Sequence, residues 1–166
     1  MRAGIAFGSN LDNRREYLQS ARKQVLQIAH ADAPLLFSPL YETDPIGCEP
    51  DAKKFLNAVV EIDYHDEPEQ LLCELRRIEG FLGRDADHTR NASRTIDLDL
   101  LYFGDHTINR GGLQVPHPRL HLRKFVLAPL ADIRPELILP NQTESVGALH
   151  KNLADKSSVV RVADEW

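Results

Sequence analysis

The chain has 166 residues, a length that fits one domain, and its 42% hydrophobic and 27% charged content is ordinary for a globular protein. Its formal net charge of −5 argues against a general nucleic-acid-binding or anionic-membrane surface. No apolar run approaches the ~20 residues that cross a membrane, and the N-terminal apolar segment is too short for a signal peptide.

The first part of the chain predicts a strand, a helix and a second extended segment. Residues 3–7 are the apolar run of a short buried strand, and Asn10 or Asp12 can cap the helix that follows. The apolar residues of that helix recur at helical spacing along one face. Residues 35–43 look extended but are interrupted by Pro39, which predicts an edge or bulged strand.

The middle of the chain predicts a long strand and an amphipathic helix. After a loop over residues 44–54, residues 55–64 alternate between two faces, as a half-buried strand does. Leucine and isoleucine at helical spacing predict a helix over 66–82, which Gly83 can end. The polar turn residues of 84–93 then predict a loop.

The last part of the chain predicts a strand, a hairpin and two helices. The strand covers residues 94–103, and the hairpin covers 104–117. A helix over 120–133 is expected to break at Pro129, and a weaker helix is expected near 145–153.

This order of elements, β-α-β-β-α-β plus extras, predicts the fold class. With a right-handed crossover in each half, it gives an α+β protein, a ferredoxin-like βαββαβ sandwich with both helices on one face of the sheet. The opposite face would be covered by the C-terminal hairpin and helical extras, or would hold a ligand. Residues 1–166 are expected to form a single domain.

The strand over 94–103 carries two carboxylates within an apolar run. Residues two apart share a face of a strand, so Thr95, Asp97 and Asp99 point the same way and the apolar residues between them point the other way. Like charges this close are costly when half buried, and hard cations such as Mg²⁺ remove that cost. A metal pair held by shared carboxylates suits phosphoryl-type transfer. The alternative is that both carboxylates are solvated on the outer face of an amphipathic strand.

Cationic side chains surround this acidic pair in the sequence. Arg94 begins the same segment and Arg84 begins the preceding loop, and guanidinium groups bind phosphate oxygens bidentately. The alternative is a solvated loop in which arginines pair with Asp85 and Asp87. A second cluster runs from His117 to Lys124; its His-x-x-x-His spacing is read as phosphate-facing and not as a zinc site, because Pro118 opposes a helix there.

Two other polar residues stand out on predicted apolar faces. Glu79 lies beside the helical stripe, where it can form a salt bridge with Arg76 or Arg84, or can orient an active-site arginine. Asn57 shares a strand face with Phe55. It is either an ordinary exposed amide or an amide that reads the edge of a flat heterocycle while Phe55 stacks on its plane.

Six segments together resemble a known family, 6-hydroxymethyl-7,8-dihydropterin pyrophosphokinase of folate biosynthesis. In chain order they are AFGSNLDNR, SPLYETDPIG, FLNAVVEI, RRIEGFLGR, SRTIDLDLLYFGD and VPHPRL followed by RKFVLAPLADIRPEL. The resemblance covers Ala3 to about Pro140, and SRTIDLDLLYFGD followed by VPHPRL is its most specific part. It implies the ferredoxin-like fold, ATP as co-substrate, two Mg²⁺ ions and transfer of a diphosphate to a pterin alcohol with release of AMP.

The resemblance also implies roles for individual residues. Asp97 and Asp99 match the metal-binding aspartates and, with Arg84 and Arg94, form the expected catalytic group. The expected ATP contacts are Glu79, Arg84, Arg94, His117 and Arg123. The expected pterin contacts are Thr43, Asp44, Ile46, Phe55, Asn57 and Phe125, with the two phenylalanines on either side of the ring. The chain departs from the family pattern at Asp44, Ala86, Asn91 and Pro118.

Other interpretations, partners and location complete the sequence-based picture. The alternatives are another D-x-D metal-dependent nucleotidyl- or glycosyltransferase, or a ferredoxin-like regulatory or RNA-binding module; the acidic charge opposes RNA. Expected partners are ATP and the pterin, with no nucleic acid or membrane, and a monomer is expected. Cys48 and Cys73 have neither metal-ligand spacing nor a disulfide framework, so we expect reduced thiols in a cytoplasmic protein.

Overall fold

The computed structural model describes residues 1–30, 33–49, 51–83 and 93–166. The elements in chain order are β1 (Arg2–Ser9), α1 (Arg14–Ile28), β2 (Leu36–Phe37), β3 (Leu40–Thr43), β4 (Phe55–Asp63), α2 (Pro68–Phe81), β5 (Asp97–Phe103), β6 (Ile108–Arg110), β7 (Leu113–Val115), a 3₁₀ turn (Leu120–Leu122), α3 (Lys124–Ile133), α4 (Val146–Asn152) and β8 (Val159–Ala163). Among these described helices, none has the length and apolar character to span a bilayer.

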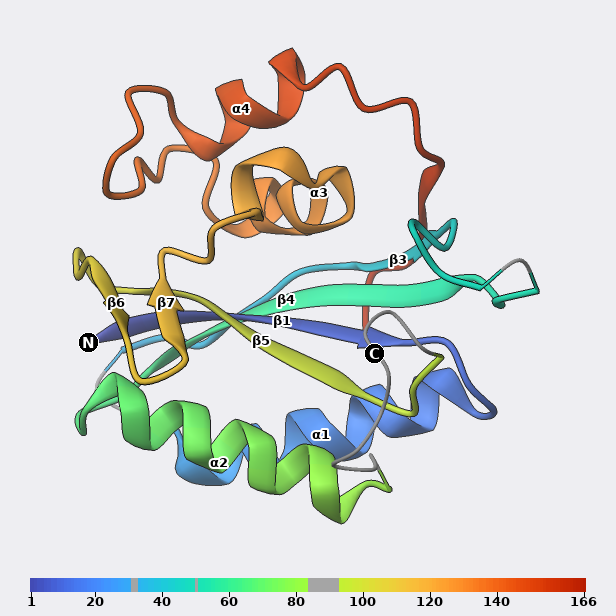
Figure 1. Cartoon of the computed structure of the whole chain (residues 1–166), viewed down its shortest axis with the longest axis horizontal. Coiled ribbons are helices and arrows are strands. Elements are labelled where there is room, and N and C mark those ends of the chain that lie inside the picture. Colours follow the sequence, from blue (N-terminus) through green and yellow to red (C-terminus); the bar gives the residue numbers. More distant parts are fainter. Residues whose placement is uncertain (31–32, 50, 84–92) are drawn as a thin grey trace.

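The main sheet has the strand order β5-β1-β4-β3-β8, and β2 pairs with β4. The neighbouring pairs along this order are all antiparallel. The last strand of the βαββαβ unit, β5, therefore lies beside the first, β1, which confirms the ferredoxin-like fold. Helices α1 and α2 cover one face, α3 and α4 cover the other, and β6 and β7 form a separate hairpin (Figure 1).

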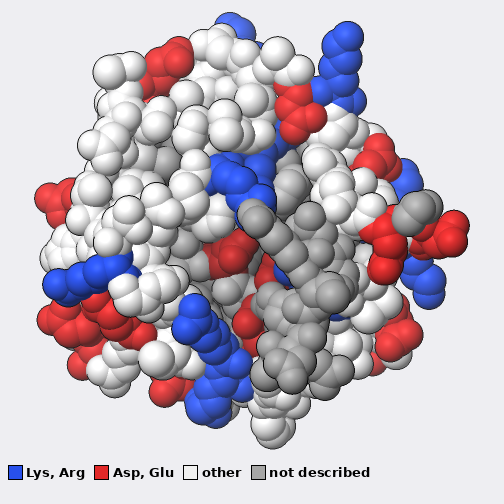
Figure 2. Space-filling view, viewed as in Figure 1, with Lys and Arg blue, Asp and Glu red and all other residues white. Residues whose placement is uncertain are grey.

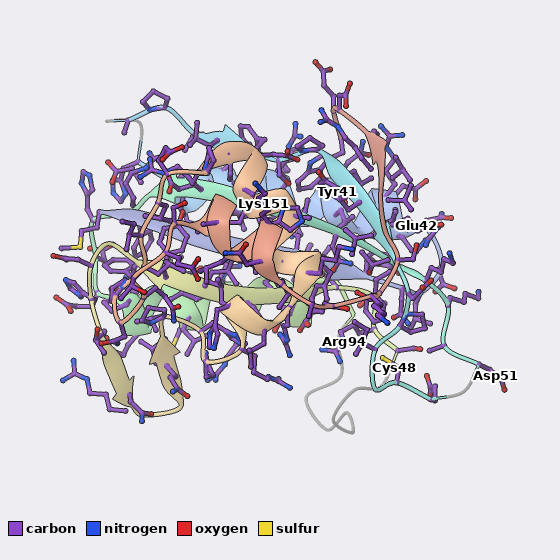
Figure 3. All side chains as sticks on the ribbon, turned by 90° about the horizontal axis from the view of Figure 1, so that it is seen from above. Tyr41, Glu42, Cys48, Asp51, Arg94 and Lys151 are labelled. Carbon is purple, nitrogen blue, oxygen red and sulfur yellow. The ribbon has the colours of Figure 1, made fainter. Side chains whose placement is uncertain are left out.

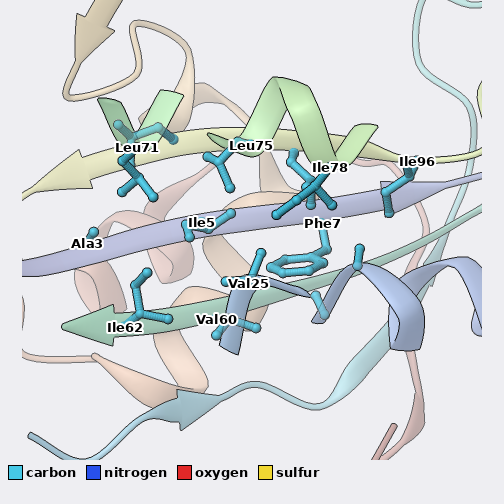
Figure 4. Close-up of a cluster of buried hydrophobic side chains, with 14 of the residues drawn as sticks. Ala3, Ile5, Phe7, Val25, Val60, Ile62, Leu71, Leu75, Ile78 and Ile96 are labelled. Atoms are coloured by element: carbon cyan, nitrogen blue, oxygen red, sulfur yellow. The ribbon is translucent and has the colours of Figure 1, made fainter. Parts of the chain in front are cut away.

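Alternation along β1 and β4 builds the core beneath the sheet. Ala3, Ile5 and Phe7 of β1 are at most 1% exposed and face the same way as the even-numbered residues of β4. They pack against the leucine, isoleucine and valine stripes of α1 and α2 (Figure 4). The stripe of α2 is Leu71, Leu75 and Ile78, as its periodicity predicts.

The opposite face of β1 is lined by small residues, and this leaves space for larger side chains of the neighbouring strand β5. Gly4 lies directly against the ring of Tyr102 from β5, so a side chain there has no space. The Tyr102 hydroxyl donates to Glu61, a fully buried carboxylate of β4 that also pairs with Arg2 at 2.6 Å. A second apolar cluster under α3 and α4 covers this part of the face.

Gly4→Ala is expected to destabilise the protein by about 1–3 kcal/mol, the usual effect of overpacking a core. The added methyl group would lie 2.1 Å from Cε1 of Tyr102, and that ring is 2% exposed. Urea denaturation of the variant and the wild type measures the difference. Gly80→Ala on α2 is the matched control, because nothing lies within 4 Å of its Cβ; there alanine should stabilise slightly. Equal stability of the two variants would contradict the close packing.

Two expectations about secondary structure, the break at Pro129 and the start of the acidic strand, are wrong. Helix α3 continues through Pro129, because the proline removes only one backbone hydrogen bond while Val126 to Leu130 are buried in the core. The expected edge or bulged strand over 35–43 is observed in its bulged form: the segment is divided into β2 and β3 around Pro39, and the pairing of β3 with β8 shifts register between Leu40 and Tyr41. The acidic strand begins at Asp97 and not at residue 94.

Candidate active site

A cavity of about 240 Å³ opens at the end of the sheet where β1, β4 and the start of β5 meet. It is lined by Gly8, Thr43, Asp44, Ile46, Cys48, Phe55, Asn57, Arg94, Asp97, Asp99, Arg119, Arg123 and Phe125. Acidic and basic side chains meet in a hollow near the middle of the face shown in Figure 2. Figure 3 shows the labelled Arg94 and Cys48 close together near one edge of the molecule. The cavity thus joins segments that are far apart in the sequence.

The two aspartates of β5 point into this cavity together. Leu98 and Leu100, between and beyond them, pack in the core beneath the sheet. A guanidinium faces each carboxylate: Nη1 of Arg94 lies 2.8 Å from Oδ2 of Asp97, and Nη1 of Arg123 lies 3.7 Å from Oδ2 of Asp99. The predicted shared face is therefore confirmed, and the mutual repulsion of the carboxylates is relieved by arginines.

The donor set of the cavity fits a divalent cation. Mg²⁺ prefers oxygen ligands, keeps several waters, and is commonly held by one or two carboxylates together with substrate phosphates. Asp97 and Asp99 supply two such carboxylates. Among the described residues no group of three or more His, Cys, Asp or Glu side chains could hold a metal by itself. A cation here would therefore take its remaining ligands from water and a bound phosphate chain.

Aromatic and amide groups line the part of the cavity next to the aspartates. Phe55 opens β4 and Phe125 lies in the first turn of α3, so the two rings come from different layers. Nδ2 of Asn57 donates to Oγ1 of Thr43 at 2.7 Å, and both residues are buried. This bond fixes the amide plane and leaves Oδ1 on the side of Gly8. The arrangement suits a flat ring held on its faces by aromatics and at its edge by an amide.

Arg123 links the aromatic and acidic parts of the cavity. Its guanidinium carbon lies 5.4 Å from the centre of the Phe125 ring, and its Nη1 faces Asp99. Burial, and secondly the nearby Arg119, lower the pKa of Arg123 below the usual value for arginine. Arg123, which is half buried, and the exposed Arg119 are kept close together, and two such cations strongly attract a polyanion.

His117 and Glu79 are absent from the described lining of the cavity. Glu79 is buried on α2, and its Oε1 accepts a hydrogen bond of 2.7 Å from the backbone N–H of Leu98, between the two aspartates. It therefore holds β5 against α2. The backbone N–H of His117 donates to Leu101 at 2.7 Å, which anchors the following segment to β5.

His117 is expected to make the protein less stable in mild acid. Burial, then the charges of Arg123 and Arg119, lower its pKa to about 4. The unfolded chain, with a pKa of about 6.5, binds a proton that the folded chain does not, so stability falls as pH drops from about 6.5 towards 4. Because the ring is partly exposed, we expect about 1–2 kcal/mol.

The measurement compares wild type and His117→Gln in urea at neutral pH and at about pH 5. Comparing the two proteins cancels the carboxylates that titrate in the same range. The free energy of unfolding of the wild type, relative to that of His117→Gln, should fall on acidification. A difference that stays constant or grows would contradict a neutral, half-buried imidazole.

Asn10 is a positioning residue that the sequence interpretation missed, since it was assigned to cap a helix. It is fully buried, its Oδ1 accepts from Arg94 N at 2.7 Å, and its Nδ2 donates to Ser93 Oγ at 3.0 Å and Lys53 O at 3.3 Å. Asn10 thus holds three segments at the mouth of the cavity. Helix α1 begins instead after Asn13.

Two lining residues, Gly8 and Cys48, were not predicted, whereas Arg119 belongs to the cationic cluster expected over 117–124. Gly8 is placed by strand register, opposite Asn57 on one side and Asp97 on the other, which no local pattern reveals. Both cysteines have free thiols. The predicted contact Arg84 lies outside the described residues.

Paired carboxylates and arginines that face one cavity are suited to metal-dependent phosphoryl transfer, and the fold positions them beside an aromatic wall. The chain belongs to the 7,8-dihydro-6-hydroxymethylpterin-pyrophosphokinase family, whose sequence model matches residues 4–135. This agrees with the resemblance seen in the sequence.

Individual relatives extend this match over most of the chain. It is 37% identical over 157 residues to the 2-amino-4-hydroxy-6-hydroxymethyldihydropteridine pyrophosphokinase of Haemophilus influenzae, covering 95% of this chain and 96% of the relative. It is 44% identical over 134 residues to the protein of the same name from Bacillus subtilis, covering 79% and 77%. A solved structure of wild-type Plasmodium falciparum HPPK-DHPS with SDX-DHP matches with a TM-score of 0.72 at 14% identity, covering 90% of this chain and 44% of that one. That likeness supports the fold alone.

Proposed function

We infer that this protein transfers the terminal diphosphate of ATP to the hydroxymethyl group of 6-hydroxymethyl-7,8-dihydropterin, releasing AMP, as a step of tetrahydrofolate biosynthesis. The observation that carries this inference is the shared cavity: the carboxylates of Asp97 and Asp99 and the rings of Phe55 and Phe125 face one space. A flat ring held by the phenylalanines would present its hydroxymethyl group to phosphates held beside the carboxylates. Family membership supports the same reaction.

The pterin is proposed to lie in the aromatic part of the cavity. Phe55 and Phe125 would stack on its faces, and the amide of Asn57, fixed by Thr43, would read its polar edge. Asp44 and Ile46 line the same part of the cavity and would complete the pocket. Holding the ring rigidly aligns the attacking hydroxyl, which is the main contribution of a protein to this kind of transfer.

The ATP phosphates are proposed to lie between the acidic pair and the arginines. Two Mg²⁺ ions bound by Asp97 and Asp99 would neutralise phosphate charge and polarise the β-phosphoryl group. Arg94 and Arg123, which face the carboxylates in this structure, would turn to the phosphates when the nucleotide is bound. Arg84, Glu79 and His117 are proposed as further nucleotide contacts.

The chemical step is an in-line displacement at the β-phosphorus. The hydroxymethyl oxygen forms a bond to that phosphorus and releases its proton to the solvent. The bond from the phosphorus to the oxygen that bridges the α- and β-phosphates breaks, and AMP leaves with that oxygen. The arginines stabilise charge on the transferred and departing groups, and no covalent intermediate with the protein is needed. Enclosure by the aromatic walls would keep water from competing with the alcohol.

The proposal also includes the oligomeric state, the domain organisation and the cellular location of the chain. We propose that the chain works as a monomer. The tail strand β8 joins the main sheet, which supports one domain over residues 1–166. Free thiols at Cys48 and Cys73 fit a reducing compartment such as the cytoplasm. Nucleic acid and membranes are not expected as partners.

The test is the appearance of AMP from ATP and Mg²⁺, with and without the pterin alcohol, followed by chromatography. We expect AMP and the pterin diphosphate in equal amounts, and neither product when the pterin is left out. Formation of ADP, or release of AMP that does not depend on the pterin, would overturn the proposal.

A further inference from the structure

The C-terminal segment bridges the two walls of the cavity. After α4, residues 153–158 run down to the sheet, and β8 then pairs with β3 so that Val159 lies opposite Thr43 (Figure 1). On this path the segment meets the first residue of α3 and the residue that follows β3. One of these elements carries Phe125, and the other leads into the loop with Asp44 and Ile46.

Asp155 makes the contact with α3. Its Oδ2 accepts from the backbone N–H of Lys124 at 3.4 Å, and its Oδ1 accepts from the backbone N–H of Ser157 at 2.8 Å. The residue at the N-cap position of α3, Arg123, makes no side-chain capping bond. A carboxylate from a distant part of the chain thus satisfies the first helical N–H and places negative charge at the positive end of the helix.

The contact is reinforced by the neighbouring residues. The ammonium group of Lys124 donates to the carbonyl oxygen of Ser157 at 3.4 Å. The hydrogen bond from the backbone N–H of Ser157 holds the pKa of Asp155 below its usual value, so the carboxylate is charged at neutral pH. The turn Asp155–Ser157 is therefore fixed both within itself and to the start of α3.

The next residue makes the contact with the opposite wall. The carbonyl oxygen of Ser158 accepts from the backbone N–H of Asp44 at 3.3 Å. Asp44 lines the cavity directly after Thr43, whose hydroxyl orients the amide of Asn57. Four consecutive residues of the tail therefore connect the helix that carries Phe125 with the strand end that carries Thr43 and Asp44.

We propose that Asp155 is a positioning residue for the pterin: through the tail it sets the distance between the Phe125 wall and the Thr43–Asp44 wall. This role rests on the proposed function of the cavity. Without Asp155 the start of α3 loses its cap, and Phe125 is no longer held in register with the strand end. The nucleotide part of the cavity depends less on this link. Of its proposed contacts, Arg123 lies at the start of α3 beside the cap, whereas Arg94, Asp97 and Asp99 are held by β1, β5 and Asn10.

The test measures pterin and nucleotide affinity separately in Asp155→Ala and Asp155→Asn. Pterin binding is followed by its fluorescence in the presence of an ATP analogue with a methylene bridge between the α- and β-phosphates, well below the melting temperature. We expect the pterin Kd and KM to rise by about tenfold in the alanine variant, which is the effect of losing one charge-assisted hydrogen bond. The rise should be smaller in the asparagine variant, because asparagine keeps one acceptor oxygen. The nucleotide Kd should change by no more than about twofold.

Asp164→Ala and Asp164→Asn are the matched controls. Asp164 is in the same tail, is exposed, and pairs with Arg161 on the surface, so these changes should leave both affinities unaltered. If the alanine variant does not fold, the asparagine variant decides. Pterin affinity within about twofold of the wild type, or equal losses for both ligands, would overturn the role of Asp155. A wild-type protein that forms no AMP would instead refute the function itself.

Discussion

Asp97→Asn and Asp99→Asn are each expected to lower kcat for AMP formation by about a thousandfold or more. Either change removes one of the two carboxylates that face the cavity, and with it an anionic ligand for the cations that accompany ATP. An amide oxygen keeps the shape but carries no charge to offset the phosphates. The rate of AMP release at saturating ATP and Mg²⁺ gives the loss directly.

The loss should come without unfolding. Asp97 and Asp99 are only partly buried, and each lies near an arginine that solvent also reaches, so neutralising one carboxylate leaves no fully buried charge unpaired. Asp105→Asn is the control: it makes the same substitution in the exposed turn after β5, outside the cavity. Turnover near that of the wild type in either cavity variant would refute metal binding by the pair.

The part of the site that the sequence predicts is the part governed by local periodicity. Asp97 and Asp99 fall on one face because side chains alternate along a strand, and the same rule places Phe55 and Asn57 together on β4. The resemblance to a family then assigns the Asp97–Asp99 face to metal binding and the Phe55–Asn57 face to binding of the pterin ring. No distant contact has to be known for either step.

The part that the sequence does not predict depends on long-range pairing. β8 was not predicted, although three of its five residues are valines; it lies at the sheet edge with three residues exposed, so alternation marks no buried face. Asn10 resembles a helix cap by type and position, and its real partners, Lys53, Ser93 and Arg94, come from other segments. Such residues become visible only when the chain is folded.

Gly8 shows how strand register makes a site residue out of an ordinary glycine. β1 is central, so Gly8 lies between Asn57 of β4 and Asp97 of β5, the amide of the proposed ring site and a carboxylate of the proposed metal site. A Cβ on Gly8 would lie 3.1 Å from Oδ1 of Asn57 and within 4 Å of Phe55 and Asp97. Because Gly8 has no side chain, space remains beside Asn57 for the edge of a flat ring.

Gly8→Val is accordingly expected to raise the pterin Kd by about a hundredfold or more, since its methyl groups would occupy the ring site. Asn57 cannot easily move aside, because Thr43 holds it at 2.7 Å and both are buried. Valine favours strands, so the backbone itself gives no reason for unfolding. Titration of the pterin and of the ATP analogue against the variant measures the two affinities.

ATP affinity is the internal control, because the phosphates are proposed to lie beside Asp99 and the arginines, further along the cavity than Gly8. It should fall by less than about tenfold in Gly8→Val. Gly80→Ala, where nothing lies within 4 Å of the added Cβ, should bind both ligands like the wild type. If the valine variant binds the pterin as well as the wild type does, the ring does not lie over Gly8, and Phe55, Asn57 and Phe125 lose their proposed role with it.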